Sequence, residues 1–314
     1  CLSMVQLTDA IFFDYFFDKG KVIYELDKKA DTDRESFEGG FVVEPTQGYH
    51  RWLACNDFAS LYPSTIQTCN ISFENYIGPV EGDERKRMEA DPAYFVSVRG
   101  IAYSNDANYS FSDIQKSLKE RRNIPKYRAK ALDAGILSII DSIIADEEVK
   151  KSAEDNLNKY VDFCFDKFKV RSVSDLCIMD RDTLMELKRK VVSQIAEDYS
   201  LEQATKLYGN SLYGGCSHPS CYFYNIDVAA DITAEGRHAT HTMERVLTNF
   251  WVNEWHDALD LHTMLGVKVS DNLCRMLLRD ERDIIVYGDT DSLYSTYDKL
   301  IATCAGSDSW SDTR

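Results

Sequence analysis

Residues 284–297 read IIVYGDTDSLYSTY, in which two apolar and β-branched runs flank the polar tetrapeptide Gly288-Asp289-Thr290-Asp291. This pattern predicts two strands joined by a tight hairpin turn that carries two carboxylates. Asp and Gly are also common in turns for conformational reasons alone, so this stretch does not by itself distinguish a site from a structural turn.

A third carboxylate follows another candidate strand. Trp52-Leu53-Ala54-Cys55 is short and apolar, and it predicts a buried strand that stops at Asp57. Carboxylates that converge from strand ends suit Mg²⁺, which prefers oxygen ligands and retains water. Two such ions, about 3.5–4 Å apart, stabilise the attacking and leaving oxygens of nucleotidyl transfer. Asp57, Asp289 and Asp291 are therefore the candidate ligands of two Mg²⁺ ions.

A basic helix is expected to begin at Ser112, because Ser112 and Gln115 have the spacing of a capping box. Four basic residues at helical spacing share one of its faces: Lys119, Arg122, Lys126 and Lys130. A ridge of one sign suits phosphates, and the alternative is a solvated charged face. Pro125 within this stretch should kink the helix.

Two further helices are expected. Helical spacing from Asp180 predicts a long helix with this apolar stripe: Leu184, Leu187, Val191 and Ile195. A separate helix is expected to begin at Ser200, and one of its faces carries Gln203, Lys206, Asn210 and Tyr213. An amide, a cation and a phenol on one face suit a nucleotide, although an exposed helix face is the alternative. Residues 79–110 are expected to be irregular or mixed, and residues 145–169 to form an exposed helical tip.

Composition narrows the class of protein. The 314 residues are 44% hydrophobic and 28% charged, which is ordinary for a folded protein and excludes collagen, coiled coil and wholesale disorder. Lys+Arg 36 against Asp+Glu 52 gives a net charge of −16, which argues against a simple basic nucleic-acid-binding protein. No apolar run reaches the roughly 18 residues of a membrane span, so no membrane partner is expected.

The nine cysteines are odd in number and never form a C-x₂-C pair. Reduced thiols are therefore expected rather than a disulfide framework or a structural zinc site. Cys216 and Cys221 flank His218, and this constellation is a weak metal candidate.

Three segments, in order, resemble motifs A, B and C of the family B DNA polymerases. They are Asp57-Phe58-Ala59-Ser60-Leu61-Tyr62-Pro63-Ser64, Lys206-x₃-Asn210-Ser211-x-Tyr213-Gly214 and Tyr287-Gly288-Asp289-Thr290-Asp291-Ser292. The basic Arg122-x₃-Lys126 pair lies between motifs A and B, as in that family. Residues 37–45 (FEGGFVVEP), residues 222–227 (YFYNID) and residues 230–233 (ADIT) resemble the T-even bacteriophage branch. The resemblance covers about residues 37–297, with Phe37 and Thr65 as departures from the usual residues.

The resemblance implies a role for each matching residue. Asp57 and Asp291 would ligate both catalytic metals, and Asp289 would stand beside them. The incoming triphosphate would be held by Arg122, Lys126 and Lys206, helped by Asn210 and by the backbone amides of Ser60 and Leu61. Tyr62 would lie under the sugar of the nucleotide, and Tyr213 would contact the nascent base pair.

The fold implied is α+β, a palm built on an antiparallel sheet with a helical fingers subdomain. Its expected parts are the end of the exonuclease-to-polymerase region (1–36), palm with motif A (37–110), fingers (111–212) and palm with motif C (213–314). No Asp-x-Glu precedes residue 37, and the sequence stops about 20 residues after motif C, so a partial chain without a thumb is expected. Alone, this piece should extend primers poorly.

The implied reaction is template-directed addition of a dNMP to a primer 3′-hydroxyl, with release of pyrophosphate, in DNA replication. The implied partners are primer–template DNA, dNTPs and, through regions outside this sequence, a sliding clamp and replisome proteins in the host cytoplasm. Two alternatives stay open: a non-catalytic relative, which should have lost metal carboxylates, and a reverse transcriptase or RNA polymerase. Neither of the latter two typically carries the Ser-Leu-Tyr-Pro-Ser run together with Asn-Ser-x-Tyr-Gly.

Overall fold

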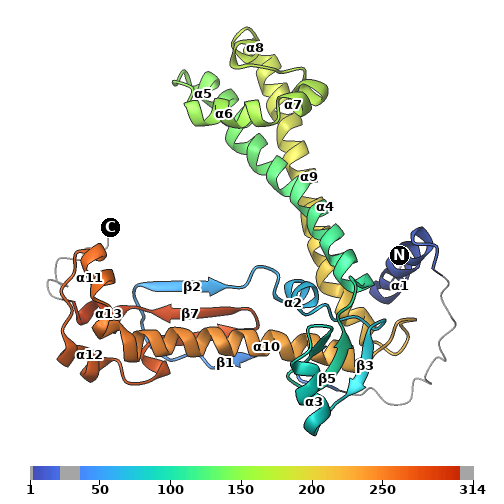
Figure 1. Cartoon of the computed structure of the whole chain (residues 1–314). Coiled ribbons are helices and arrows are strands. Elements are labelled where there is room, and N and C mark those ends of the chain that lie inside the picture. The colour runs from blue at the N-terminus through green and yellow to red at the C-terminus, as the bar shows by residue number, and fades with distance from the viewer. Residues whose placement is uncertain (1–2, 22–35, 305–314) are drawn as a thin grey trace. The chain divides into compact units, whose positions relative to one another are not determined.

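A four-stranded antiparallel sheet carries the hairpin that the sequence predicts (Figure 1). The structure is a computed structural model that describes residues 3–21 and 36–304. Its strands, in spatial order, are β1 (Val42–Val43), β6 (Ile285–Asp289), β7 (Ser292–Thr296) and β2 (Leu53–Asp57). The predicted hairpin is confirmed, because β6 and β7 pair antiparallel around a turn of two residues. The predicted α+β class is confirmed as well.

Strand β2 differs from its prediction in burial. It forms where expected, but its residues alternate between exposed and half-buried, and none is buried. It lies at one edge of the sheet, whereas the neighbouring β7 buries Leu293, Ser295 and Thr296. The apolar composition of residues 52–55 identified the strand but could not show that it lies at an edge.

A smaller sheet occupies part of the segment expected to be irregular or mixed. It contains β3 (Tyr76–Pro79), β5 (Ile101–Ser104) and β4 (Tyr94–Val96), in that spatial order, with α3 (Gly82–Glu89) beside it. Val80, Met88 and Ala102 form its core. The segment is thus mixed, but its individual strands were not predicted, because strands of three or four residues are too short for an alternating pattern to stand out.

Helix α10 (Ile226–Asn249) runs alongside the four-stranded sheet and packs against β7 and α2 (Leu61–Cys69) (Figure 1). Asn225 caps its first turn by accepting a hydrogen bond from the Val228 amide at 3.1 Å. Farther along, Thr233 and Arg237 donate to backbone carbonyls of the 37–45 segment. Helix α10 therefore joins the sheet, motif A and this upstream segment.

The remaining elements of this part of the chain surround that frame. They are α1 (Met4–Asp18), η2 (Phe250–Glu254), η3 (Trp255–Asp257), α11 (Leu259–Leu265), α12 (Asp271–Leu277), η4 (Glu281–Asp283) and α13 (Asp298–Ala302). One core cluster lies under the hairpin and includes Trp255, Ile284, Ile285 and Leu293. The aromatic start of the chain packs through Phe12, whose ring contacts those of Phe16, Phe73, Phe111 and Phe223. The charged stretch after it lies outside the described residues.

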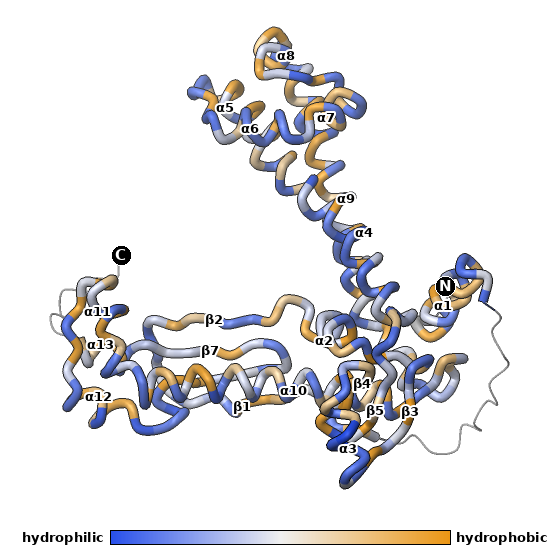
Figure 2. Tube along the Cα trace, viewed as in Figure 1, coloured by the Kyte–Doolittle hydropathy of each residue, from blue (hydrophilic) through white to orange (hydrophobic). Residues whose placement is uncertain are grey.

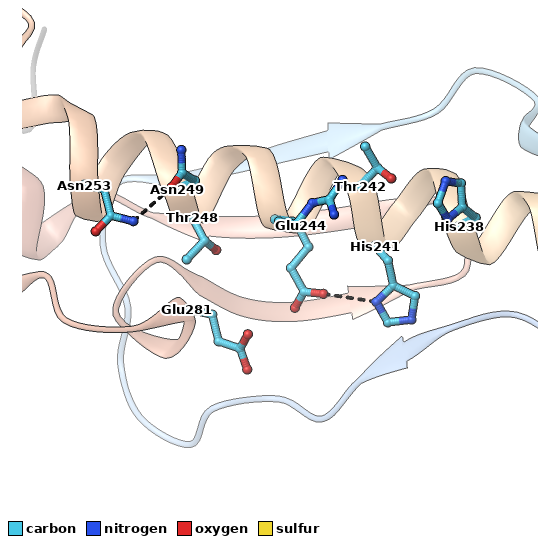
Figure 3. A pocket seen from close by; sticks show the side chains of 9 residues that line it. His238, His241, Thr242, Glu244, Thr248, Asn249, Asn253 and Glu281 are labelled. Carbon is cyan, nitrogen blue, oxygen red and sulfur yellow. Dashed lines mark hydrogen bonds and ion pairs between the residues drawn. The ribbon is translucent and has the colours of Figure 1, made fainter.

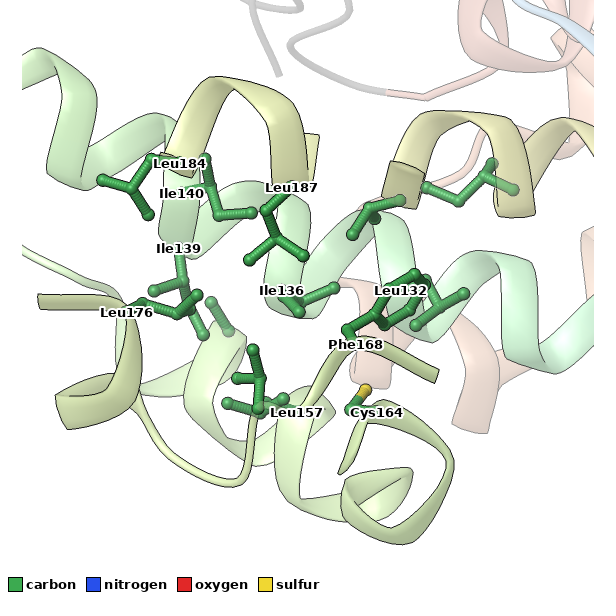
Figure 4. Packing of buried hydrophobic residues seen from close by; sticks show 14 of the residues in the cluster. Leu132, Ile136, Ile139, Ile140, Leu157, Cys164, Phe168, Leu176, Leu184 and Leu187 are labelled. Carbon is green, nitrogen blue, oxygen red and sulfur yellow. The ribbon is translucent and has the colours of Figure 1, made fainter. Parts of the chain in front are cut away.

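Residues 113–212 form a compact unit separate from the rest of the chain. Its elements are α4 (Ser110–Leu132), η1 (Asp133–Leu137), α5 (Ser138–Ala145), α6 (Lys151–Lys159), α7 (Val161–Phe168), α8 (Val173–Cys177) and α9 (Arg181–Cys216). Their apolar side chains meet in one core (Figure 4), which includes Leu132, Ile136, Leu157, Leu176, Leu184 and Leu187. The assignment of this unit as fingers, and of the other as palm, stays a prediction.

The helices of this unit correct several expectations. Helix α4 begins at Ser110, two residues before the predicted start, and the Ser110 amide donates to Glu74 Oε2 at 2.7 Å. The Gln115 side chain makes no capping box there, because its Nε2 donates to the Gly209 carbonyl at 2.7 Å. Pro125 lies inside α4 without ending it, and hydrophilic residues predominate along the helix (Figure 2).

The predicted long helix from Asp180 is confirmed, but the separate helix at Ser200 is wrong. Helix α9 runs unbroken from Arg181 to Cys216, and Ser200 Oγ donates to the Ala196 carbonyl inside it. A Ser three residues before a Gln also fits the middle of a helix, where the hydroxyl bonds to the preceding turn. The expected exposed tip at 145–169 is wrong in part, because Leu157, Cys164 and Phe168 are buried. None of the helices in the described ranges combines the length and apolarity that a membrane crossing requires.

Candidate active site

The hairpin turn that carries Asp289 and Asp291 is held from two sides. Thr290 has a φ of +52°, which is unusual for a residue with a side chain. Its amide donates to the Phe41 carbonyl at 2.7 Å, and its own carbonyl accepts from Thr240 Oγ1 on α10 at 2.9 Å. These two bonds to neighbouring segments fix the turn in this conformation.

Gly40 lets the upstream segment approach the turn closely. A Cβ at Gly40 would lie 2.5 Å from Thr290 Oγ1, a separation that real Cβ atoms do not show. Position 40 therefore requires a residue without a side chain while Thr290 keeps this rotamer.

Asp57 lies next to this turn. In the sheet register Asp57 of β2 and Asp289 of β6 are both paired with Ser292, from opposite sides of β7. Just beyond β2, the Phe58 amide donates to the Asp291 carbonyl at 2.8 Å. The backbone thus brings Asp57 and Asp291 to the same end of the sheet, with Asp57 and Asp289 exposed and Asp291 half-buried.

The donor set fits Mg²⁺ in one particular way. Within residues 3–21 and 36–304, no three His, Cys, Asp or Glu side chains cluster closely enough to form a metal centre by themselves. Mg²⁺ is usually held by one or two carboxylates together with water and substrate phosphates rather than by an all-protein cage. A pair of carboxylates at the open end of a sheet fits that mode of binding.

Motif A turns sharply after β2. Ser60 precedes α2 with φ +58° and ψ 60°, and its side chain does not cap the helix. The helix N-terminus that Leu61 opens lacks a side-chain cap, and such an end attracts anions through its amides and dipole. Leu61 itself is buried, which anchors the start of α2.

Tyr62 is enclosed by two other parts of the same unit. Its ring packs on that of Tyr213, with centroids 4.7 Å apart. On α10, a Cβ at Gly236 would lie 2.9 Å from Tyr62 Cε1, so this glycine leaves the space that the ring needs. Burial, reinforced by Tyr213 and by the nearby Asp291 and Asp289 carboxylates, raises the pKa of Tyr62 to about 12. The Tyr62 hydroxyl is therefore protonated near neutral pH.

The cationic and amide candidates of the helical unit lie on α4 and α9. Lys206 and Asn210 are exposed on α9, and Lys126 is half-buried on α4. Arg122 is not a freely solvated cation, because its Nε and Nη2 contact Glu202 Oε1 at 2.7 and 2.6 Å. The solvated-face alternative is therefore wrong for Arg122.

The structure places the predicted site residues in two groups. Around the hairpin it brings together Asp57, Ser60, Leu61, Tyr62, Tyr213, Asp289 and Asp291. The other group, on the two long helices, contains Arg122, Lys126, Lys206 and Asn210.

Sequence reasoning missed Gly236, Thr240 and Glu202. Gly236 and Thr240 lie four residues apart, which places them on one face of α10, but no local signal tells which face meets motif A. Glu202 precedes Lys206 by four residues on α9, and this spacing could have indicated a carboxylate among the cations.

Two other features lie apart from these groups. A surface pocket of about 430 Å³ follows α10 (Figure 3), and it is lined by residues that include His238, His241, Glu244, Thr248 and Asn253 but by none of the predicted site residues. Cys216 and Cys221 are buried free thiols, and Cys221 Sγ donates to Asp9 Oδ1. Burial raises the pKa of the Cys216 thiol, which disfavours the thiolate that a metal requires.

The chain is similar to several known proteins. The chain is 26% identical over 311 residues to the DNA-directed DNA polymerase of Escherichia phage RB69, covering 95% of this chain and 30% of that protein. It is 26% identical over 308 residues to the DNA-directed DNA polymerase of Enterobacteria phage T4, covering 96% of this chain and 31% of that protein. Among solved structures it is similar to the family B DNA polymerase from Pyrobaculum calidifontis, with a TM-score of 0.45 and 18% identity, covering 96% of this chain and 28% of that one.

The chain therefore spans about a third of the length of these curated relatives. A family model described as DNA polymerase family B matches residues 8–165 and 181–303, which is most of the sequence. The chain belongs to DNA polymerase family B.

Proposed function

We propose that this chain is the palm and fingers of a template-directed DNA polymerase, which adds a dNMP to a primer 3′-hydroxyl and releases pyrophosphate. The observation that carries the proposal is the bond from the Phe58 amide to the Asp291 carbonyl. It joins motif A to motif C, 233 positions apart in the sequence, at one end of the sheet. The carboxylates of both motifs are present there.

Asp57 and Asp291 are the residues that would hold two Mg²⁺ ions, with Asp289 beside them. When bound, the ions would supply stabilisation of the charge on the attacking and leaving oxygens. The tethered hairpin turn supports this role, because a ligand on a fixed turn needs no reorganisation when substrate arrives.

The incoming triphosphate would be bound by Arg122, Lys126 and Lys206, with Asn210 as an amide contact. Exposed Lys206 and Asn210 on one face of α9 support this assignment, and the uncapped start of α2 supports a contribution from the amides of Ser60 and Leu61. Cations and helix N-termini both favour phosphate oxygens, the first through charge and the second through oriented N–H groups.

Tyr62 would lie under the deoxyribose, and Tyr213 would contact the nascent base pair. The packing of their rings supports a shared wall for the nucleotide, since each ring limits the movement of the other. A 2′-hydroxyl would then compete for the volume that the Tyr62 ring fills.

Primer extension by the full-length protein that contains this chain tests the proposal. We expect Mg²⁺-dependent addition of deoxynucleotides on a DNA template, with little use of ribonucleotides. Preference for an RNA template would favour a reverse transcriptase, and preference for ribonucleotides an RNA polymerase. No addition with any template would favour a non-catalytic relative, although retention of all three carboxylates argues against this outcome. A sliding clamp, replisome proteins and the host cytoplasm remain part of the proposal through the family resemblance.

A further inference from the structure

Two arginine–carboxylate pairs join α4 to α9. Arg122 Nε and Nη2 lie 2.7 and 2.6 Å from Glu202 Oε1. Arg128 Nε lies 2.8 Å from Asp198 Oδ2, and its Nη2 lies 2.5 Å from Asp198 Oδ1. From the first pair to the second, the residue number rises on α4 and falls on α9. The two helices therefore run antiparallel, and the two pairs follow one another along them.

The two pairs are matched in burial. The side chains of Arg122 and Glu202 keep 21% and 6% of their accessible surface, and those of Arg128 and Asp198 keep 22% and 2%. A carboxylate withdrawn from water to this extent is stabilised only by its partners. Glu202 has a second one, because its Oε2 accepts from Gln203 Nε2 at 2.8 Å.

The surroundings of the two pairs differ. Glu202, Lys206 and Asn210 follow one another at intervals of four residues, so they share a face of α9. Arg122 is thus bound to a carboxylate that lies one helical turn from Lys206 on α9. Lys126 follows Arg122 by one turn on α4. Arg128, in contrast, lies 4.5 Å from the centroid of the Phe163 ring, next to the helical core.

We infer that Glu202 is a positioning residue, which holds the Arg122 guanidinium on the face that carries Lys206 so that it meets the triphosphate in a fixed orientation. This inference rests on the proposed function, because it takes Arg122 as a triphosphate ligand. An unpaired arginine samples many rotamers, and ordering it on binding lowers affinity. Fixing two of its nitrogens on one carboxylate oxygen removes part of that cost.

The Glu202 charge has an opposing effect, because a carboxylate beside Arg122 also repels phosphate. The direction of change on removing the charge therefore distinguishes positioning from competition. Positioning requires weaker nucleotide binding without the carboxylate, whereas competition requires tighter binding.

The test is single-turnover extension by the full-length polymerase, with dNTP concentration varied on one primer–template. Glu202→Gln keeps the shape of the side chain and removes its charge, and we expect it to raise the apparent dNTP constant about tenfold. Asp198→Asn is the matched control, since it breaks the equally buried neighbouring pair. We expect both variants to lower the melting temperature and Asp198→Asn to leave the dNTP constant within about twofold.

Two further variants show whether Glu202 acts through Arg122. In an Arg122→Ala background, Glu202→Gln should add nothing to the dNTP constant, because the residue that it orients is gone. Arg122→Lys keeps the charge but cannot place two nitrogens on one oxygen, so it should raise the constant even where Glu202→Gln folds poorly.

Each outcome has a definite meaning. An unchanged or lower dNTP constant in Glu202→Gln, with a raised constant in Arg122→Ala, would overturn the positioning role and leave the proposed function intact. An equal rise in Asp198→Asn would overturn it too, because the effect would then be general to the helix pair. If Arg122→Ala and Lys206→Ala both leave the constant unchanged, the proposed function itself fails.

Discussion

The rings of Tyr62 and Tyr213 pack against each other with centroids 4.7 Å apart and planes inclined by 56°. Tyr62 belongs to motif A and Tyr213 to motif B, so the contact joins two segments that are distant in the sequence. Burial raises the pKa of both hydroxyls, which keeps them protonated near neutral pH. The pair presents apolar ring surface and hydrogen-bond donors, a combination suited to a sugar.

Truncation of Tyr62 should relax sugar selection. We expect Tyr62→Ala or Tyr62→Val to increase the use of ribonucleotides relative to deoxynucleotides by orders of magnitude, while deoxynucleotide addition changes comparatively little. The measurement is kcat/KM for matched ribo- and deoxynucleotides on one primer–template. Equal loss for both substrates would mean that Tyr62 is only a packed aromatic.

Removal of a carboxylate proposed to bind metal should abolish nucleotide addition. Asp57→Ala or Asp291→Ala in the full-length enzyme should slow addition by several orders of magnitude, because several kcal/mol of transition-state stabilisation disappear. Duplex binding, measured by gel shift, should be retained. Asp271→Ala is the control, since Asp271 pairs with Arg275 on an exposed face of α12. Near-normal addition by Asp57→Ala would contradict the assignment.

The lysines of α4 and α9 should differ in their effect on nucleotide addition. Lys206→Ala should raise the apparent dNTP constant and slow the chemical step, since charge on the phosphates develops towards the transition state. Lys126→Ala should behave alike, whereas exposed Lys130→Ala, one turn farther along α4, should have a smaller effect. Rapid-quench kinetics measure the apparent dNTP constant and the rate of the chemical step. If none of the three variants changes either quantity, the lysines form a solvated charged face.

Loss of the Thr240 hydroxyl should loosen the hairpin turn that carries Asp289 and Asp291. Thr240→Val removes the donor to the Thr290 carbonyl at a fully buried position, and we expect a loss of about 1–2 kcal/mol in the free energy of unfolding and slower nucleotide addition. The matched control is Thr248→Val on the same helix. Among the described residues, Thr248 Oγ1 is buried with no hydrogen-bond partner, so its removal should be neutral or stabilising. Similar losses in both variants would show that the bond to Thr290 contributes nothing particular.

Asp231 should make stability depend on pH. Its fully buried carboxylate accepts from Tyr103 OH at 2.6 Å and from Arg99 Nη1 at 3.0 Å, yet burial raises its pKa from 3.8 to about 6. Between about pH 4 and 6 the folded state binds this proton more tightly than the unfolded chain, so its contribution to stability falls as pH rises through that window. The full effect is on the order of 3 kcal/mol.

Urea unfolding at pH 4 to 7 measures this dependence. The free energy of unfolding of the wild type, minus that of Asp231→Asn, should fall as pH rises, because asparagine has no proton to lose. This holds whichever of the two proteins is the more stable. Parallel pH profiles for the two proteins would show that Asp231 titrates at its ordinary pKa.

The hairpin and the long helix of the Leu184–Ile195 stripe could be predicted because their signals are local. Two apolar runs around Gly288–Asp291 leave little choice but a turn, and a stripe of four residues at helical spacing requires a helix. The continuity of α9 through Ser200 could not be predicted, because a capping pattern is equally compatible with a helix interior. The strands of the small sheet were not predicted because each has only three or four residues, too few for an alternating pattern to stand out.

The same distinction applies to the site. Asp57, Asp289, Asp291 and Tyr62 are proposed from motifs, because a motif records residue type and local order, and their roles stay predictions. Gly236 and Thr240 carry no such mark, since their importance comes only from which face of α10 meets Tyr62 and Thr290. Likewise, the pairing of Arg122 with Glu202 depends on how two antiparallel helices pack, which no spacing within one helix specifies.

Helix α10 places Gly236 against Tyr62 and Thr240 against Thr290, one helical turn apart. One helix therefore fixes both the Tyr62 ring and the hairpin turn, through two contacts that lie about 6 Å apart along its axis. A movement of this helix cannot change one contact without the other: a shift that widens the space beside Tyr62 also displaces the turn that carries Asp291. Substitutions along this face of α10 should therefore change fidelity and speed together, and variants that trade one for the other are to be sought elsewhere in the chain.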